Sequence, residues 1–485
     1  MKSQLPSLGL VFSPWLLAVP ASLALCACSG PASRPEVGAA VPSTASAPQS
    51  PEPPTSVAAA APAASLAPVA QPPACAPLQT TLPELITTDI DVPVPAIEDA
   101  TGRAMDAFHD KLARLLRGRA TRPVRIGMYG DSNMTRDYIT GELRRTLQRR
   151  HGDAGHGFLS AGQPWSWYLH QDVKHGLDKD GWKSIDMSTD QVLDRLYGFA
   201  GIAAESQRPN AVSWFATSSP PSVVGQSVSL IDVYFLKRPK GGTFEVRVDG
   251  VSRATVDTRG EKHEAGFELV EVDDGPHKIE LVSGRGAVRL FGVTMERKVP
   301  GIVVDSLGIG GVSMELIARG DRAVGIQTLR RRQYDLVMFL TGATESDTPG
   351  HAQAVKQLVQ MHREALPEAS ILLMSPPDLA GGPGKQPTRN PRMGRLTREK
   401  RRLAQETGIA YWDFRGAMGG DMSIARFTDR GMAWNDYIHL SEKGGTYMGR
   451  RFAYALVRDF AEWSERHPEA GCDGSLDEPS RQAGR

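Results

Sequence analysis

The stretch Val124-Arg-Ile-Gly-Met-Tyr-Gly-Asp-Ser-Asn133 decides how the rest of the chain is interpreted. Its first six residues form a mostly apolar run of the kind that becomes a buried strand. Gly130 ends the run, and apolar residues then recur at helical spacing: Met134, Tyr138, Ile139, Leu143 and Leu147. A strand that passes directly into a helix is the repeating unit of a parallel α/β sheet.

Further units of the same kind follow downstream. Four more compact apolar runs are candidate strands, at residues 301–305, 335–340, 371–374 and 410–413. Helix-like patterns lie between them at 313–332, 350–366 and 392–407, and a last amphipathic helix precedes residue 470. This alternation predicts an α/β fold of three layers, with a parallel sheet covered by helices on both faces.

The pattern changes over residues 205–299, where short, often alternating strands are separated by turns such as Lys240-Gly-Gly242 and Asp249-Gly250. Such a segment predicts an antiparallel β-sandwich. Because it lies between parts of the α/β pattern, we expect it to be an insertion. The α/β domain would then comprise residues 78–200 and 300–470, followed by a flexible tail at 471–485.

The N-terminal part is predicted to deliver and tether the protein. Residues 1–28 contain an apolar run broken by prolines, which favours a secretory signal over a membrane span. Leu25-Cys-Ala-Cys28 resembles the bacterial lipobox, in which the cysteine is lipidated; the alternative is cleavage without a lipid. Residues 29–77 are rich in Pro, Ala and Ser and predict a disordered tether. We therefore expect an outer-membrane-anchored lipoprotein of the bacterial cell envelope, facing the periplasm or the exterior.

The composition and motifs of the chain limit which classes of partner and cofactor we expect. The 485 residues carry 56 Lys+Arg against 55 Asp+Glu, a net charge of +1, which argues against a nucleic-acid partner. No phosphate loop, dinucleotide fingerprint or metal motif is present, so we expect neither cofactor nor metal.

Cys75 and Cys472 flank the folded region, and they are either a disulfide or two free thiols. Histidines outside the catalytic motifs are expected to be surface or packing residues: His151, His156, His170 and His175. The basic run 330–332 is expected at a solvated helix end.

Two short segments carry the candidate chemistry. Gly130-Asp-Ser-Asn133 places a serine where a strand ends and a helix begins, and Asp436-Tyr-Ile-His439 precedes the last helix. A serine hydroxyl is a weak nucleophile until a histidine takes its proton, and the imidazole needs a carboxylate to fix its other nitrogen. Each segment alone has an ordinary structural explanation, an N-cap for the first and a surface turn for the second.

Together, and in this order, the two segments resemble the SGNH (GDSL-type) hydrolase superfamily. The resemblance implies a flavodoxin-like three-layer fold in which Ser132 attacks, His439 is the general base and Asp436 orients it. It also implies an oxyanion hole formed by Ser132, by Gly311 in Asp305-Ser-Leu-Gly-Ile-Gly-Gly311, and by Thr344, which stands where the family usually has Asn. Residues near these blocks are candidates for substrate binding: Asp131, Asn133, Gly342, Glu345, Trp165 and Trp167.

The first helix, the Gly155-His-Gly-Phe158 turn and the inserted sandwich extend the resemblance to bacterial peptidoglycan O-acetylesterases, in which the insertion is a carbohydrate-binding-module-like jelly roll. This implies a secreted serine esterase acting on an O-acetylated envelope glycan. Two alternatives stay open at this point. One is an O-acetyltransferase that uses the same triad, and the other is a non-catalytic glycan-binding lipoprotein. Trp165 and Trp167 either stack on sugars or pack the insertion against its host.

Overall fold

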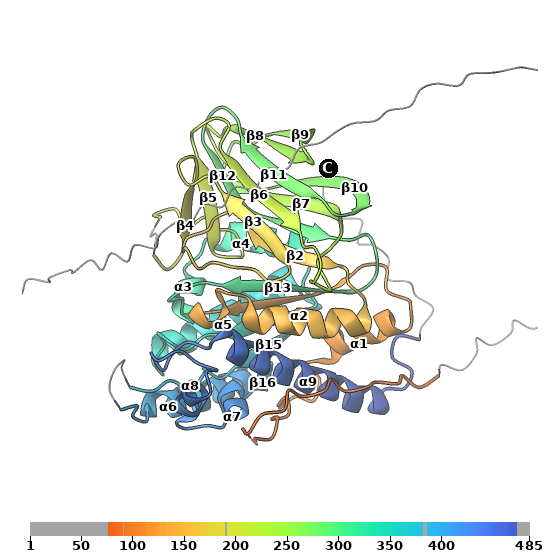
Figure 1. The fold of residues 1–485 in the computed structure, drawn as a ribbon, viewed down its shortest axis with the longest axis vertical. Coiled ribbons are helices and arrows are strands. Elements are labelled where there is room, and N and C mark those ends of the chain that lie inside the picture. The colour runs from red at the N-terminus through yellow and green to blue at the C-terminus, as the bar shows by residue number, and fades with distance from the viewer. Residues whose placement is uncertain (1–75, 91, 190–191, 382–385, 473–485) are drawn as a thin grey trace, which may run out of the picture. The chain divides into compact units, whose positions relative to one another are not determined.

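The structure of this protein, a computed structural model, describes residues 76–90, 92–189, 192–381 and 386–472. Its central feature is a five-stranded parallel sheet in the order β13-β1-β14-β15-β16 (Figure 1). The strands are β1 (Val124–Gly130), β13 (Ile302–Gly308), β14 (Leu336–Leu340), β15 (Ser370–Met374) and β16 (Ala410–Trp412). The α/β fold and all five strands predicted from the apolar runs are confirmed.

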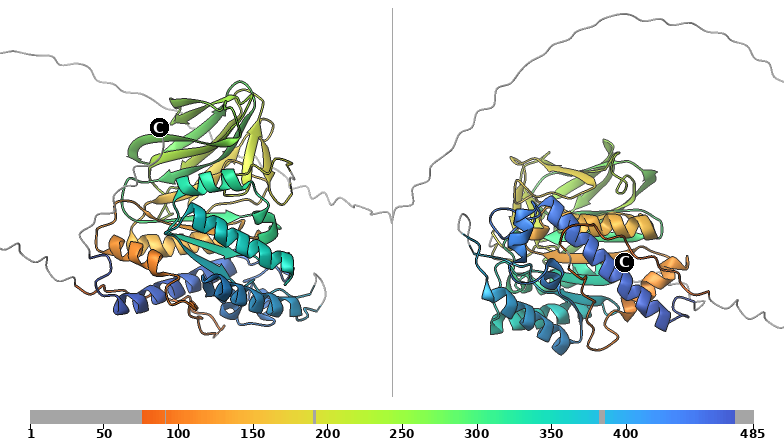
Figure 2. Two further views of the ribbon diagram at one scale, coloured as in Figure 1. Left: turned by 180° about the vertical axis from the view of Figure 1, so that it is seen from behind. Right: turned by 60° about the horizontal axis from the view of Figure 1, so that its bottom comes forward.

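Helices cover both faces of this sheet, because alternate strand residues point to opposite sides. Met338 and Leu340 join the core beneath one group of helices, and Val337 and Phe339 join the core beneath the other. Figure 2 shows α9 in dark blue on one face and α4 and α5 in teal on the other. The first group is α1 (Asp106–Leu116), α2 (Tyr138–His151), α7 (Phe414–Met418), α8 (Ser423–Asp429) and α9 (Glu442–Arg466). The second is α3 (Met314–Ala318), α4 (Arg322–Arg332), α5 (Pro349–Ala365) and α6 (Pro391–Thr407).

Two antiparallel sheets form the sandwich, with their own apolar core between them. One sheet contains β10 (Glu264–Gly275), β7 (Val228–Lys237), β12 (Val288–Glu296), β5 (Ile202–Ser206), β4 (Lys183–Asp186) and β2 (Gly155–Ser160). The other contains β3 (Val173–Leu177), β6 (Val212–Thr217), β11 (Lys278–Ser283), β8 (Thr243–Val248) and β9 (Val251–Asp257).

Strand pairing extends this sandwich upstream of the predicted 205–299. Strands β2, β3 and β4 all precede residue 205, and each pairs within one of the two sheets. The sequence pattern did not indicate them, because β2 contains two glycines, a histidine and a serine and so forms neither an apolar run nor a clear alternation, whereas β3 and β4 are short. The loop between β2 and β3 runs back to the end of the parallel sheet, where the Leu169 N–H donates to Thr135 O.

The basic C-terminal end of α4 connects the parallel-sheet domain to the antiparallel sandwich. Arg331 pairs with Asp232 of β7 at 2.8 Å. The buried Arg332 pairs with Asp305 at 2.6 Å and with Glu296 at 2.5 Å. Arg332 and Arg125, which also pairs with Glu296, together outweigh burial and lower the pKa of Glu296 to about 2. The expectation of a solvated helix end is therefore wrong for Arg331 and Arg332, because carboxylates of β7, β12 and β13 face them. Removing one partner of such a buried pair costs about 3–5 kcal/mol.

The predicted signal, tether and tail lie almost wholly outside the described residues, as does Cys28. Among the helices that the structure describes, none combines the length and apolar content needed to cross a bilayer. Cys472 forms a disulfide bond. Its predicted partner Cys75 is outside the described residues, so that pairing stays a prediction.

Candidate active site

Ser132 lies in a single 3-10 turn, η1 (Ser132–Met134), directly after β1. The turn begins there because Asp131, its N-cap, accepts the N–H of Asn133 at 3.1 Å. The other carboxylate oxygen of Asp131 accepts the N–H of Ala343 at 3.0 Å. Asp131 is fully buried, and burial raises its pKa although both N–H groups oppose the shift. Its side chain therefore joins the Ser132 turn to the loop after β14.

The parallel register brings the candidate site to one edge of the sheet. Gly130, at the end of β1, pairs with Gly308 on one side and with Leu340 on the other. The loops that carry Ser132, Gly311 and Thr344 consequently leave neighbouring strands at the same carboxyl edge, where α/β folds place their sites.

His439 connects Ser132 to Asp436. Its Nε2 lies 2.8 Å from Ser132 Oγ, and its Nδ1 lies 2.7 Å from Asp436 Oδ2. The second oxygen of Asp436 accepts the N–H groups of Ile438 at 2.8 Å and His439 at 3.0 Å. Burial raises the pKa of Asp436, but these hydrogen bonds outweigh it, so the pKa is lowered. The carboxylate is thus held ionised and aimed at the imidazole.

Asn133 holds the histidine loop against the serine turn. Its side-chain oxygen accepts the N–H of Leu440 at 2.8 Å, and its amide nitrogen donates to Ile438 O at 3.4 Å. Only 6% of Asn133 is exposed. The structure therefore gives this candidate substrate-binding residue, like the buried Asp131, a supporting contact between loops.

Two backbone donors are available beside Ser132. Among the described residues, neither the Ser132 N–H nor the Gly311 N–H donates to a protein acceptor. Gly311 is exposed and adopts φ +73°, a left-handed conformation that glycine reaches without strain. The Thr344 hydroxyl lies 3.3 Å from both Gly311 O and Val312 O, to which it donates. Thr344 consequently braces the Gly311 loop and does not present a free third donor.

Gly342 and Glu345 also support the loop after β14. A Cβ at Gly342 would lie 2.2 Å from Pro376 Cβ, so no side chain fits there. Glu345 is 1% exposed; it accepts the N–H of Met314 at 2.7 Å and pairs with Lys400 at 2.8 Å. Both residues were candidates for substrate contact, and the structure buries both.

Three tryptophans lie on loops that contact the site. Trp165 is half-buried, and its indole packs against Gly310, where a Cβ would lie 3.2 Å from the ring. Trp167 is 48% exposed on the same loop, which is tied to the serine turn by a bond from Leu169 N–H to Thr135 O. Trp434 is 54% exposed, and its backbone N–H donates to His439 O at 2.8 Å. Sequence reasoning missed Trp434, although it lies only five residues before His439.

Two groups of side chains, buried except for the partly buried Glu315, have the composition of a metal site: Asp137, His156 and His170, and Glu315, Glu345 and His351. Burial lowers the pKa of His170 to about 3, which keeps that imidazole neutral. Asp137, however, accepts two hydrogen bonds from Arg144 and one each from Thr140 and Gln171. Lys400 lies against Glu345 in the same way. In both groups a side-chain cation already neutralises the carboxylate, which favours ion pairs over metal binding.

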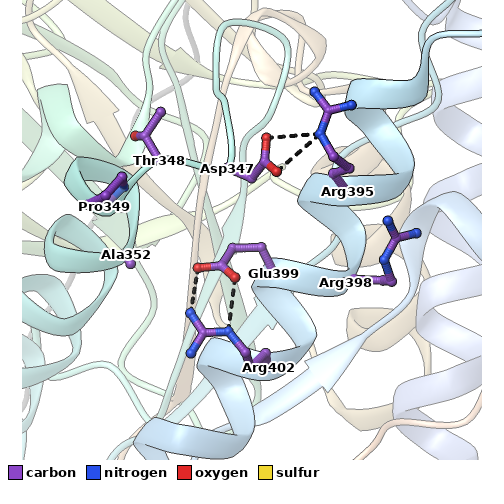
Figure 3. Close-up of a pocket in the computed structure, with 8 residues that line it drawn as sticks. All are labelled: Asp347, Thr348, Pro349, Ala352, Arg395, Arg398, Glu399 and Arg402. Atoms are coloured by element: carbon purple, nitrogen blue, oxygen red, sulfur yellow. Dashed lines mark hydrogen bonds and ion pairs between the residues drawn. The ribbon is translucent and has the colours of Figure 1, made fainter.

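A cavity of about 450 Å³ lies between the start of α5 and the length of α6 (Figure 3). It is lined by Asp347, Thr348, Pro349, Ala352, Arg395, Arg398, Glu399 and Arg402. Two of its arginines are paired with carboxylates, Arg395 with Asp347 and Arg402 with Glu399. None of the residues that surround Ser132 lines it, so the cavity is separate from the site described above.

The chain is similar to known proteins in sequence and fold. Residues 275–446 match the model of the GDSL-like lipase/acylhydrolase family; this range contains Gly311, Asp436 and His439 but begins after Ser132. A solved structure of a peptidoglycan O-acetylesterase is 23% identical, with a TM-score of 0.60, over 76% of this chain and 99% of that chain. A family two carbohydrate esterase from Clostridium thermocellum in complex with cellohexaose is 10% identical, with a TM-score of 0.25, over 58% of this chain and 100% of that chain. No curated protein matches the chain.

Proposed function

We propose that this chain, which belongs to the SGNH (GDSL-type) superfamily of ester hydrolases, is a secreted serine esterase that removes acetyl groups from an O-acetylated cell-envelope polysaccharide such as peptidoglycan. One observation carries the proposal. A hydrogen-bonded path runs from Ser132 Oγ through both nitrogens of His439 to Asp436, at the open edge of the sheet. The similarity in fold to a peptidoglycan O-acetylesterase supports the choice of substrate.

In the first half of the reaction, Ser132 Oγ attacks the acetyl carbonyl carbon while His439 Nε2 takes the hydroxyl proton. Asp436 stabilises the resulting imidazolium through Nδ1–H. The N–H groups of Ser132 and Gly311 donate to the oxyanion of the tetrahedral intermediate. When this intermediate collapses, His439 returns its proton to the sugar oxygen, which leaves as a hydroxyl. The acetyl group stays on Ser132.

In the second half, a water molecule takes the place of the departed sugar. His439 Nε2 removes a proton from the water, whose oxygen attacks the acetyl carbonyl and regenerates an oxyanion at the same two N–H groups. Collapse releases acetate, and the proton held by His439 passes back to Ser132 Oγ. A sugar hydroxyl in place of the water would make the same residues a transferase.

Two exposed tryptophans, on loops that contact the serine turn and the histidine, give the site a means of binding a polymer. Trp167 comes from the loop between β2 and β3, and Trp434 comes from the loop that carries the histidine. Aromatic faces pack well against the C–H faces of sugar rings while leaving hydroxyl groups in water. We propose that these side chains hold the glycan across Ser132.

Replacing Trp434 with alanine should raise KM for O-acetylated peptidoglycan about tenfold, which corresponds to about 1.4 kcal/mol of lost binding. KM for p-nitrophenyl acetate, which has no sugar, should change far less. Steady-state kinetics with both substrates measure the difference, and Leu269→Ala, at another exposed apolar residue, is the matched control. Equal effects on the two substrates would argue against a glycan contact.

The activity itself is tested by measuring acetate release from a panel of O-acetylated polysaccharides that includes peptidoglycan, with Ser132→Ala as the blank. Free acetate from at least one glycan supports the esterase. An acetylated acceptor sugar without free acetate would instead identify a transferase. Wild-type protein that matches the blank on every glycan and on p-nitrophenyl acetate would contradict the proposal and leave only glycan binding.

We also propose that Cys28, outside the described residues, carries a lipid that anchors the protein in the outer membrane. The support is the lipobox-like Leu25-Cys-Ala-Cys28 followed by a Pro/Ala/Ser-rich segment. Metabolic labelling with a clickable fatty acid should mark the wild-type protein and leave Cys28→Ala unlabelled. A secreted wild-type protein that takes up no lipid would contradict the anchor.

A further inference from the structure

The peptide unit between Gly310 and Gly311 decides where one of the two oxyanion donors points. A trans peptide is planar, and its C=O and N–H groups point in opposite directions. The group that holds Gly310 O therefore also sets the direction of the Gly311 N–H. This links the geometry of the oxyanion hole to whatever contacts the far side of the loop.

The two glycines cannot hold this peptide plane by themselves. Gly311 adopts φ +73°, and a Cβ built on it would have no neighbour within 4 Å. Glycine adopts positive and negative φ about equally readily, so rotation of the peptide meets little steric resistance. A donor that is free to rotate loses much of its value, because stabilisation of an oxyanion depends on donors already in place.

Ser188 supplies the missing restraint. Its Oγ lies 2.6 Å from Gly310 O, and among the described residues it gives that carbonyl its hydrogen bond. Trp165 packs beside Gly310, and Thr344 holds the following carbonyl, that of Gly311. Ser188 is thus the residue that hydrogen-bonds to the peptide unit carrying the Gly311 N–H.

Ser188 is itself fixed in place by Asp186, the last residue of β4. The fully buried Asp186 accepts the N–H groups of Ser188 at 2.8 Å and Thr189 at 2.9 Å. Its Oδ1 also lies 2.6 Å from Ser188 Oγ, so the hydroxyl proton is shared between this oxygen and Gly310 O. The two backbone bonds fix this turn, and they keep the Ser188 hydroxyl within hydrogen-bond distance of Gly310 O.

We propose that Ser188, which follows strand β4 of the inserted sandwich, is a positioning residue that orients the Gly311 N–H into the oxyanion hole. The inference rests on the proposed esterase function and assigns the insertion a part in transition-state stabilisation. Ser188 touches neither substrate nor reacting atoms. It acts through the Gly310–Gly311 peptide, and therefore its loss affects the rate of the chemical step more than substrate binding.

Ser188→Ala should lower kcat by about 10- to 100-fold with little change in KM, because complete loss of one such donor costs about 10²- to 10³-fold. Affinity for a boronate inhibitor, whose tetrahedral adduct carries an anionic oxygen, should fall by the same factor. Ser188→Thr keeps the hydroxyl and should recover most of both losses. The assay is p-nitrophenyl acetate hydrolysis with purified full-length protein.

Ser206→Ala is the matched control, because Ser206 is a buried serine of the same sandwich whose hydroxyl also donates to a carbonyl, that of Arg208. It should retain wild-type kcat. Equal losses in the two variants, an unchanged kcat in Ser188→Ala, or a raised KM alone would overturn the role of Ser188. These results are distinct from failure of the proposed function, in which wild type itself would be no more active than Ser132→Ala.

Discussion

Replacing Ser132 with alanine should lower kcat for ester hydrolysis by about 10⁴- to 10⁶-fold. The reason is geometric. Ser132 Oγ lies 2.8 Å from His439 Nε2, and among the described residues it is the hydroxyl that the histidine contacts. Without it, no acyl-enzyme forms, and only the oxyanion donors and the orienting contacts can still assist attack by water. Initial rates with p-nitrophenyl acetate and with O-acetylated glycan measure the loss.

The variant should remain folded, because Ser132 is half-buried and the turn is capped by Asp131. Thermal melting monitored by circular dichroism should therefore give a midpoint near that of wild type. A folded Ser132→Ala protein that hydrolyses the ester at the wild-type rate would place the nucleophile elsewhere. A rate loss that merely follows unfolding would leave Ser132 without a chemical role.

Asp436→Asn should lower kcat at pH 7 by about 10⁴-fold while leaving the fold intact. Asp436 Oδ2 lies 2.7 Å from His439 Nδ1, and only a carboxylate both keeps the proton on Nδ1 and stabilises the imidazolium. An asparagine can turn its NH₂ toward Nδ1, which moves the ring proton to Nε2. That nitrogen could then no longer accept the proton of Ser132.

The pH dependence of kcat in wild type and in Asp436→Asn tests whether Asp436 acts in its ionised form. Because the pKa of Asp436 is lowered in the folded protein, its pairing with His439 is present above the usual aspartate pKa of about 4. The pairing is lost only as pH falls through the lowered value. Wild type should therefore keep this contribution to kcat at mildly acidic pH, and acid should not bring Asp436→Asn closer to wild type. A pH–rate profile in which the two converge between pH 5 and 8 would contradict the role of Asp436.

The parallel sheet and the contacts of His439 with Ser132 and Asp436 could be predicted because each depends on local sequence. Buried parallel strands are apolar throughout, which makes runs such as 335–340 recognisable. Ser132 and His439 are 307 residues apart, yet each stands at the border of a strand or helix, where the topology brings their loops to one edge. The order of the two motifs therefore carried more information than either motif alone.

What the sequence did not reveal depends on long-range contacts. Nothing near Ser188 in the sequence indicates Gly310, 122 residues away. The polar residues beside the catalytic motifs looked like substrate contacts, but burial gives Asn133 and Glu345 supporting roles. The donation from Thr344 to Gly311 O depends equally on how two loops meet. Such roles follow from which groups are covered, and a single sequence does not determine that.

The inserted sandwich contributes to the site in more than one way. Its loop between β2 and β3 supplies Trp165 and Trp167, and Ser188 follows β4. These are the segments whose strands lie upstream of the predicted insertion. An insertion that both borders the substrate surface and holds an oxyanion donor would couple glycan binding to the chemical step.

The most direct test of the central claim, that Ser132 is the nucleophile of an esterase, is mass spectrometry of the protein quenched in acid during turnover of an activated acetyl ester. We expect one acetyl group on the peptide that contains Ser132 in wild type, and none in Ser132→Ala. Turnover without an acetylated Ser132 peptide, together with wild-type activity in Ser132→Ala, would contradict the account.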